Sequence, residues 1–137
     1  MGAPNIVWLT LESTRSDHCS LYGYGRETTP ELDALAAERG ARAFGDCHAH
    51  GIWTRSSSAS ILTGTYPTHH TVGLDTDSRL PDELDTVPEL LGRAGYTTAC
   101  VSPNPNLSSS SGLDRGFDRF TYVSGATLLE ACPYRSL

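Results

Sequence analysis

The chain has 137 residues, a formal net charge of −6 and ten basic residues, all of them arginine. That length suits one domain or part of one. The excess of acidic residues argues against binding to nucleic acid or to an anionic membrane, and no apolar run is long enough to span a bilayer. An acidic chain without lysine is also typical of salt-adapted proteins, which gives the hypothesis that high salt stabilises the fold.

The four cysteines are widely scattered and form no Cys-x-x-Cys pair, which argues against a zinc ribbon. Residues 1–5 lead directly into an apolar segment, with neither a basic region nor a signal-peptide cleavage site. We therefore expect reduced thiols and a cytoplasmic location.

In the first third of the chain, residues 5–11 are nearly all apolar, which predicts a strand buried on both faces of a parallel sheet. The polar cluster 12–18 follows at once, at the strand end where α/β folds bind ligands. Thr29 as N-cap and Pro30 as the first helical residue predict a helix that ends at Gly40. Residues 41–48 suggest a short edge strand.

The serine-rich stretch that follows predicts a helix that starts near Thr54 and has Gly64 just beyond its end. We expect a loop over residues 65–73, then an acidic turn-rich segment. A helix over 86–95 and a buried strand over 96–101 should follow. The remaining predicted elements are a long loop at 102–112, a pair of packed aromatics within 116–120, and no closing strand. This order predicts an α/β fold with a mostly parallel sheet flanked by helices.

Several of these segments, in this order, resemble the N-terminal part of the sulfatase family, which belongs to the alkaline-phosphatase-like superfamily. The matching segments are 5–13, 17–18, 22–24, 29–36, 60–67 and 86–98. The resemblance implies an alkaline-phosphatase-like α/β fold, of which residues 1–137 would be the N-terminal part. It also implies one or two divalent metal ions beside a nucleophile at the start of a helix.

Matched position by position, the resemblance places the nucleophile at Thr54 and the family's two adjacent metal-binding acids at Glu12 and Ser13. The metal ligands implied are therefore Glu12 and Thr54, and the ion is Mn²⁺, Mg²⁺, Zn²⁺ or Ca²⁺. Because Ser13 replaces one of the two acids, the case for a second metal ion or for a Ca²⁺ site is weaker. The family's Cys/Ser-x-Pro-x-Arg motif is replaced by residues 54–58, Thr-Arg-Ser-Ser-Ser. Since threonine cannot be oxidised to formylglycine, none is expected. A Glu after the strand and a Thr nucleophile are similar to the phosphoethanolamine and glycerol-phosphate transferases of the same superfamily.

Four further residues are candidates for substrate binding. Arg55 either contacts the anion or lies on the surface. His50 and His70 each belong to a close histidine pair, and Asn104, with Asn106, falls where the family often has substrate-binding residues. The alternative for each is a surface or loop role.

The predicted function is that of a metal-dependent hydrolase or phosphotransferase for a sulfate or phosphate ester of a small molecule, glycan or lipid. Of the two, a phosphate ester is favoured over a sulfate ester, because formylglycine cannot form. The family's remaining metal ligands have no match after Phe120, so we expect this chain alone to show little turnover. The alternative is a non-catalytic fragment or degenerate binding module of the same fold, and a phosphoglycerate-mutase-like relative ranks third.

Overall fold

The computed structural model describes residues 2–75 and 78–123 of the chain. Its contacts divide the chain into two compact units, Met1–His48 and Ala49–Leu137. We call them unit 1 and unit 2 and describe each by itself.

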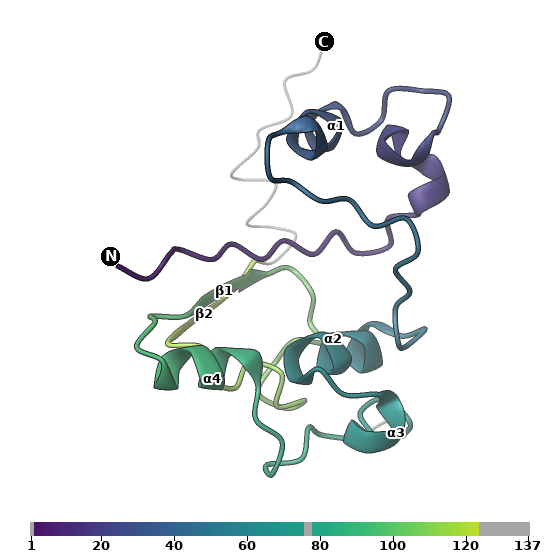
Figure 1. The fold of residues 1–137 in the computed structure, drawn as a ribbon. Helices are drawn as coiled ribbons and strands as arrows, with labels where there is room; N and C mark the ends of the chain where they lie inside the picture. Colours follow the sequence, from purple (N-terminus) through teal and green to yellow (C-terminus); the bar gives the residue numbers. More distant parts are fainter. Residues whose placement is uncertain (1, 76–77, 124–137) are drawn as a thin grey trace, which may run out of the picture. The chain divides into compact units, whose positions relative to one another are not determined.

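Unit 1 contains two 3₁₀ turns, η1 (Ser16–His18) and η2 (Ser20–Tyr22), and the helix α1 (Pro30–Ala37) (Figure 1). The helix starts where the sequence predicts, with Thr29 at the N-cap, and ends shortly before Gly40. The Ser20 hydroxyl donates to Asp33 Oδ2 at 2.6 Å and accepts the Thr29 backbone N–H at 3.0 Å. These bonds tie η2 to the first turns of α1.

The apolar segment 5–11 does not form the predicted buried strand. Val7 is 92 % exposed and Leu9 is 72 % exposed. A strand buried on both faces needs hydrogen-bonded neighbours and covering helices, and no described segment pairs with residues 5–11. Residues 41–48, expected as an edge strand, form no strand either. Apolar composition favours burial, but it does not supply the partner against which a segment is buried.

Unit 2 contains the helices α2 (Thr54–Thr63), α3 (Pro67–His70) and α4 (Val87–Arg93) and the strands β1 (Ala99–Ser102) and β2 (Arg119–Tyr122). The strands run side by side in parallel, and Ala99 is in register with Arg119 (Figure 1). Helices α2 and α4 confirm the sequence predictions. Strand β1 confirms a strand in this region but not the predicted burial, because Ala99 is exposed and Val101 is 70 % exposed. The short helix α3 replaces an expected loop, and β2 is a strand where none was expected.

The fold class is the predicted one, an α/β arrangement with a parallel sheet. The fully buried apolar side chains of unit 2 come from α2 and from the loops around it: Ala59, Val72, Leu80 and Leu113. Helix α2 also packs against α3 and α4. The core therefore holds α2 in place, and with it the serine-rich first turn of that helix.

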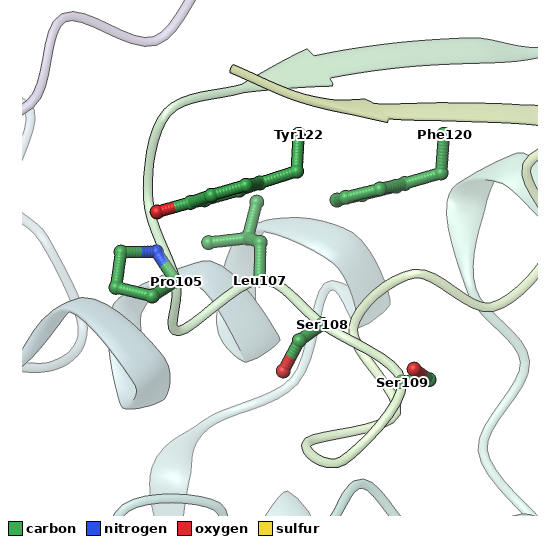
Figure 2. A pocket seen from close by; sticks show the side chains of 6 residues that line it. All are labelled: Pro105, Leu107, Ser108, Ser109, Phe120 and Tyr122. Carbon is green, nitrogen blue, oxygen red and sulfur yellow. The ribbon is translucent and has the colours of Figure 1, made fainter. Parts of the chain in front are cut away.

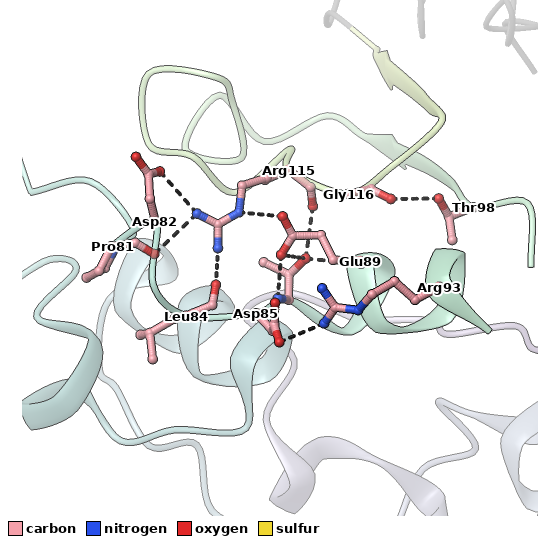
Figure 3. Close-up of polar contacts among 10 residues, drawn as sticks. Pro81, Asp82, Leu84, Asp85, Glu89, Arg93, Thr98, Arg115 and Gly116 are labelled. Atoms are coloured by element: carbon pink, nitrogen blue, oxygen red, sulfur yellow. Dashed lines mark hydrogen bonds and ion pairs between the residues drawn. The ribbon is translucent and has the colours of Figure 1, made fainter. Parts of the chain in front are cut away.

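Arg115 joins the loop before β2 to the start of α4 (Figure 3). Its Nε lies 2.9 Å from Glu89 Oε1, and its Nη1 lies 3.3 Å from Asp82 Oδ1. The guanidinium also donates to the carbonyl oxygens of Pro81, at 3.2 Å, and Leu84. One partly buried cation thus joins the loop before α4, the first turn of α4 and the loop before β2.

Candidate functional site

Thr54 is the first residue of α2, directly after Trp53 at the N-cap. No side chain caps this helix end. The first-turn N–H groups of a helix have no partners within the helix, and the helix dipole adds partial positive charge there. The start of α2 therefore favours an anionic group next to the Thr54 hydroxyl.

Two glycines pack closely against this first turn. A Cβ on Gly51 would lie 2.8 Å from Ser56 Oγ, and one on Gly73 would lie 3.1 Å from Ser56 Cβ. Gly73 also has a φ of +83°, which side chains rarely adopt. Its N–H donates to Ser78 Oγ at 2.6 Å. Two chain segments therefore hold the turn that carries Thr54.

A hollow of about 470 Å³ opens beside this turn. Its lining consists of Trp53, Thr54, Arg55, Gly73, Leu74, Asp75 and Asn106. The volume is within the range of small-molecule sites. The Arg55 guanidinium donates to the Ser78 carbonyl oxygen at 2.9 Å, which fixes a positive charge at this place. The hollow thus combines a hydroxyl, a cation, a carboxylate, an amide and an exposed indole.

Of the other predicted substrate-binding residues, none lies among the side chains that line this hollow. The exposed His50 ring lies 4.4 Å from the Tyr66 ring, measured between centroids. Asn104 Oδ1 accepts the Asn106 backbone N–H at 2.9 Å, an interaction that shapes the loop. Asn106, its partner in the sequence prediction, does line the hollow.

His70 is fully buried in unit 2. The Val72 backbone N–H donates to its Nδ1 at 3.0 Å, so this nitrogen carries no proton. In the neutral ring Nε2 is then protonated, and it donates to Ser60 Oγ at 2.9 Å. Burial lowers the pKa of His70 below its ordinary value of 6.5. The structure thus places this histidine in the interior, with both ring nitrogens in hydrogen bonds.

Glu12 is an exposed residue of unit 1 and lies in a turn directly after the apolar segment 5–11. Its neighbour Ser13 has a φ of +59°, which is uncommon outside glycine. Carboxylate and hydroxyl oxygens are the donors that hard divalent cations prefer, so Glu12 and Thr54 have the right chemistry. Within residues 2–75 and 78–123, however, no three histidine, cysteine or acidic side chains gather as a metal site would require. The described residues do not form a complete metal site.

A second hollow, of about 260 Å³, lies between β2 and the loop after β1 (Figure 2). Leu107, Phe120 and Tyr122 point into it, with Pro105 and two serines at its rim. It contains no carboxylate, imidazole or thiol that could act as an acid, base or strong nucleophile. The hollow beside Thr54 is therefore the candidate site.

The sequence did not single out Trp53, Gly73 or Asp75 as site residues. The signals available were weak: an aromatic residue directly before a helix, and a glycine and an acid in a turn-rich segment. Trp53 lies directly before Thr54, whereas Gly73 and Asp75 become site residues through the return of the chain after α3 to the start of α2. This return depends on tertiary packing.

Comparison with known proteins shows the family of this chain. The sulfatase family model matches residues 4–136. This chain belongs to the sulfatase family. An N-acetylglucosamine-6-O-sulfatase of Bacteroides thetaiotaomicron is 33% identical over 122 residues, which are 89% of this chain and 21% of that relative. The phosphoethanolamine transferase CptA of Salmonella typhimurium is 31% identical over 124 residues, 87% of this chain and 20% of that relative.

A solved structure of a protein in complex with its substrate D-glucosamine-2-N,6-O-disulfate matches the fold with a TM-score of 0.65 and 30% identity. The match covers 82% of this chain and 21% of the other. The chain thus spans about a fifth of the length of its relatives. The alkaline-phosphatase-like resemblance is confirmed. Among the residues described here, no helix has the length and apolar character to cross a membrane.

Proposed function

We propose that this chain provides the nucleophile, Thr54, of an enzyme that transfers or hydrolyses a phosphate or sulfate ester. The observation that carries the proposal is the position of Thr54. It is the first residue of α2 and lines a hollow together with Arg55. A helix start and a guanidinium both stabilise the negative charge that develops on a transferring phosphoryl or sulfuryl group.

In the proposed reaction, the Thr54 hydroxyl gives its proton to solvent water, and its Oγ forms a bond to phosphorus or sulfur. The bond from that atom to the ester oxygen breaks, and the alcohol leaves after taking up a proton. Water or a second alcohol then attacks the covalent intermediate and restores the Thr54 hydroxyl. The same steps serve hydrolysis and transfer, in keeping with relatives of both kinds. Because Thr54 cannot become formylglycine, a phosphate ester is the substrate that we favour.

Metal dependence is part of the proposal. Glu12 and Thr54 would act as two of the ligands, and a bound Mn²⁺, Mg²⁺, Zn²⁺ or Ca²⁺ would withdraw charge from the ester oxygens. Two ligands fall short of the four or more that these ions take up in proteins. Among the described residues, no three histidine, cysteine or acidic side chains gather, and this favours the second candidate function, a non-catalytic module of the same fold.

The nucleophile is tested in the complete gene product with 4-nitrophenyl phosphate and 4-nitrophenyl sulfate. We expect Thr54→Val to lower turnover at least about 1,000-fold, since it removes the attacking oxygen and keeps the shape. Thr54→Ser should retain activity and show a phosphoryl or sulfuryl adduct on the peptide that contains residue 54. Ser57→Ala, which removes a hydroxyl from the same helical turn, is the control. Full activity in Thr54→Val would overturn the proposal.

A further inference from the structure

The hollow beside Thr54 contains two side chains that the proposed reaction does not use, Trp53 and Asp75. Trp53 is 66 % exposed although it is large and apolar, and it makes no side-chain cap for α2. The face of an exposed indole is a binding surface for a cation.

Asp75 is held on the same hollow by its own turn. Its carbonyl oxygen accepts the Ser78 hydroxyl at 2.9 Å and the Ser78 backbone N–H at 3.3 Å. The backbone also forms an isolated parallel bridge between Val72 and Asp75. The position of the Asp75 backbone thus depends on the buried Val72. This backbone anchors the carboxylate beside the hollow.

The charges that line the hollow are therefore of both signs. Arg55 supplies the positive charge next to Thr54, and it is anchored on the Ser78 carbonyl oxygen. Asp75 supplies the negative charge, and the Trp53 indole belongs to the same lining. An aromatic face together with a carboxylate is the combination that binds ammonium groups. A ligand that matches the whole lining carries both an anionic ester and a cation.

We propose that Trp53 and Asp75 bind an ammonium group on the alcohol part of the substrate, which is therefore a zwitterionic ester. This inference rests on the proposed function, because Thr54 and the start of α2 receive the anionic end. The two residues determine specificity. They do not take part in bond making or breaking.

Two esters of the same shape test this proposal. Phosphocholine carries a quaternary ammonium group, and 3,3-dimethylbutyl phosphate has a neutral carbon in its place. By calorimetry on the 137-residue chain, we expect phosphocholine to bind about tenfold more tightly, as one cation–π contact and one carboxylate predict. Asp75→Asn and Trp53→Leu should each bring the two affinities to within about twofold. The control Glu83→Gln removes an exposed carboxylate outside the hollow and should keep the tenfold ratio.

The outcomes separate this inference from the proposed function. Equal affinity for both esters in the unchanged chain overturns the ammonium site and leaves the role of Thr54 standing. If neither ester binds, tetramethylammonium chloride is titrated against the Trp53 fluorescence in a Trp8→Phe background. Quenching that disappears in Asp75→Asn supports the ammonium site independently of the ester chemistry, and absence of quenching overturns it.

Discussion

His70 shows how one side chain can be fixed in a single protonation state. Its Nδ1 accepts a backbone N–H from Val72, and its Nε2 faces the hydroxyl of Ser60. A protonated ring would place a hydrogen on Nδ1 against that N–H and a charge in a buried position. The neutral ring therefore joins α2 to the chain that follows α3, close to the turn with Gly73.

This arrangement predicts that acid destabilises unit 2. Burial lowers the pKa of His70 in the folded chain below 6.5, so below that pH the unfolded chain binds more protons than the folded one. Stability should be fully present above about pH 6.5 and fall as the pH drops towards the folded-state value. Urea unfolding between about pH 5 and 8 measures this slope.

His70→Asn keeps an acceptor for the Val72 N–H and removes the titrating ring. We expect it to flatten the pH dependence in this range. His50→Asn, at an exposed histidine that does not contribute to the pKa shift of His70, should leave the slope unchanged. The explanation fails if His70→Asn and the unchanged chain lose stability with acid to the same extent.

At the scale of elements, α4 is defined at its start by a complete capping box. The Thr86 hydroxyl accepts the Glu89 backbone N–H, and the Glu89 carboxylate accepts the Thr86 backbone N–H. Thr86 Oγ1 also donates to the Arg115 carbonyl oxygen at 3.1 Å. Gly116 lies against this box, since a Cβ there would be 2.6 Å from Glu89 N and 2.9 Å from Thr86 Oγ1.

Gly116→Ala should therefore destabilise the chain by about 3 kcal/mol, from a positive φ and from steric overlap with the box. Gly95→Ala is a matched control, because Gly95 has a similar φ of +89° but open space around its Cβ position, against +86° for Gly116. We expect it to cost about 1 kcal/mol. Chemical denaturation of both variants checks the difference. Equal losses would show that the close approach contributes nothing.

The elements that the sequence predicted correctly are those with local signals. Thr86 and Pro88 mark the start of α4, and Gly64 ends α2 in the left-handed conformation with a φ of +69°. Such caps act within one turn of the chain, so they can be found in the residues themselves. Strand β2 has no such signal. It exists because Arg119–Tyr122 pair with β1, and that pairing joins residues about 20 positions apart.

The same distinction holds for the candidate site. The position of Thr54 follows from helix signals and from the resemblance to the family. Trp53 adjoins Thr54 in the chain, but Asp75 and Asn106 join the site only because later segments of the chain return to the start of α2. His70 was predicted near the substrate, and its interior position follows from two hydrogen bonds that no sequence pattern specifies.

At the scale of the whole molecule, we expect the described residues to form only part of the proposed metal site. The chain spans about a fifth of its relatives, and its two proposed ligands lie in different units, Glu12 in unit 1 and Thr54 in unit 2. Two oxygen donors bind a divalent cation only weakly, because water fills the other coordination positions.

We therefore expect the 137-residue chain to bind Mn²⁺ weakly and to hydrolyse 4-nitrophenyl phosphate no faster than Mn²⁺ alone. Mn²⁺ broadening of NMR signals should decrease around residues 12 and 54 in both Glu12→Ala and Thr54→Val, if the two residues share one ion. Glu31→Ala, another exposed acid of unit 1, serves as the control and should leave both signals broadened. Broadening that is unchanged in Glu12→Ala would remove Glu12 from the site. Metal-dependent turnover by this chain would show that the ligands it contains are sufficient, against the prediction.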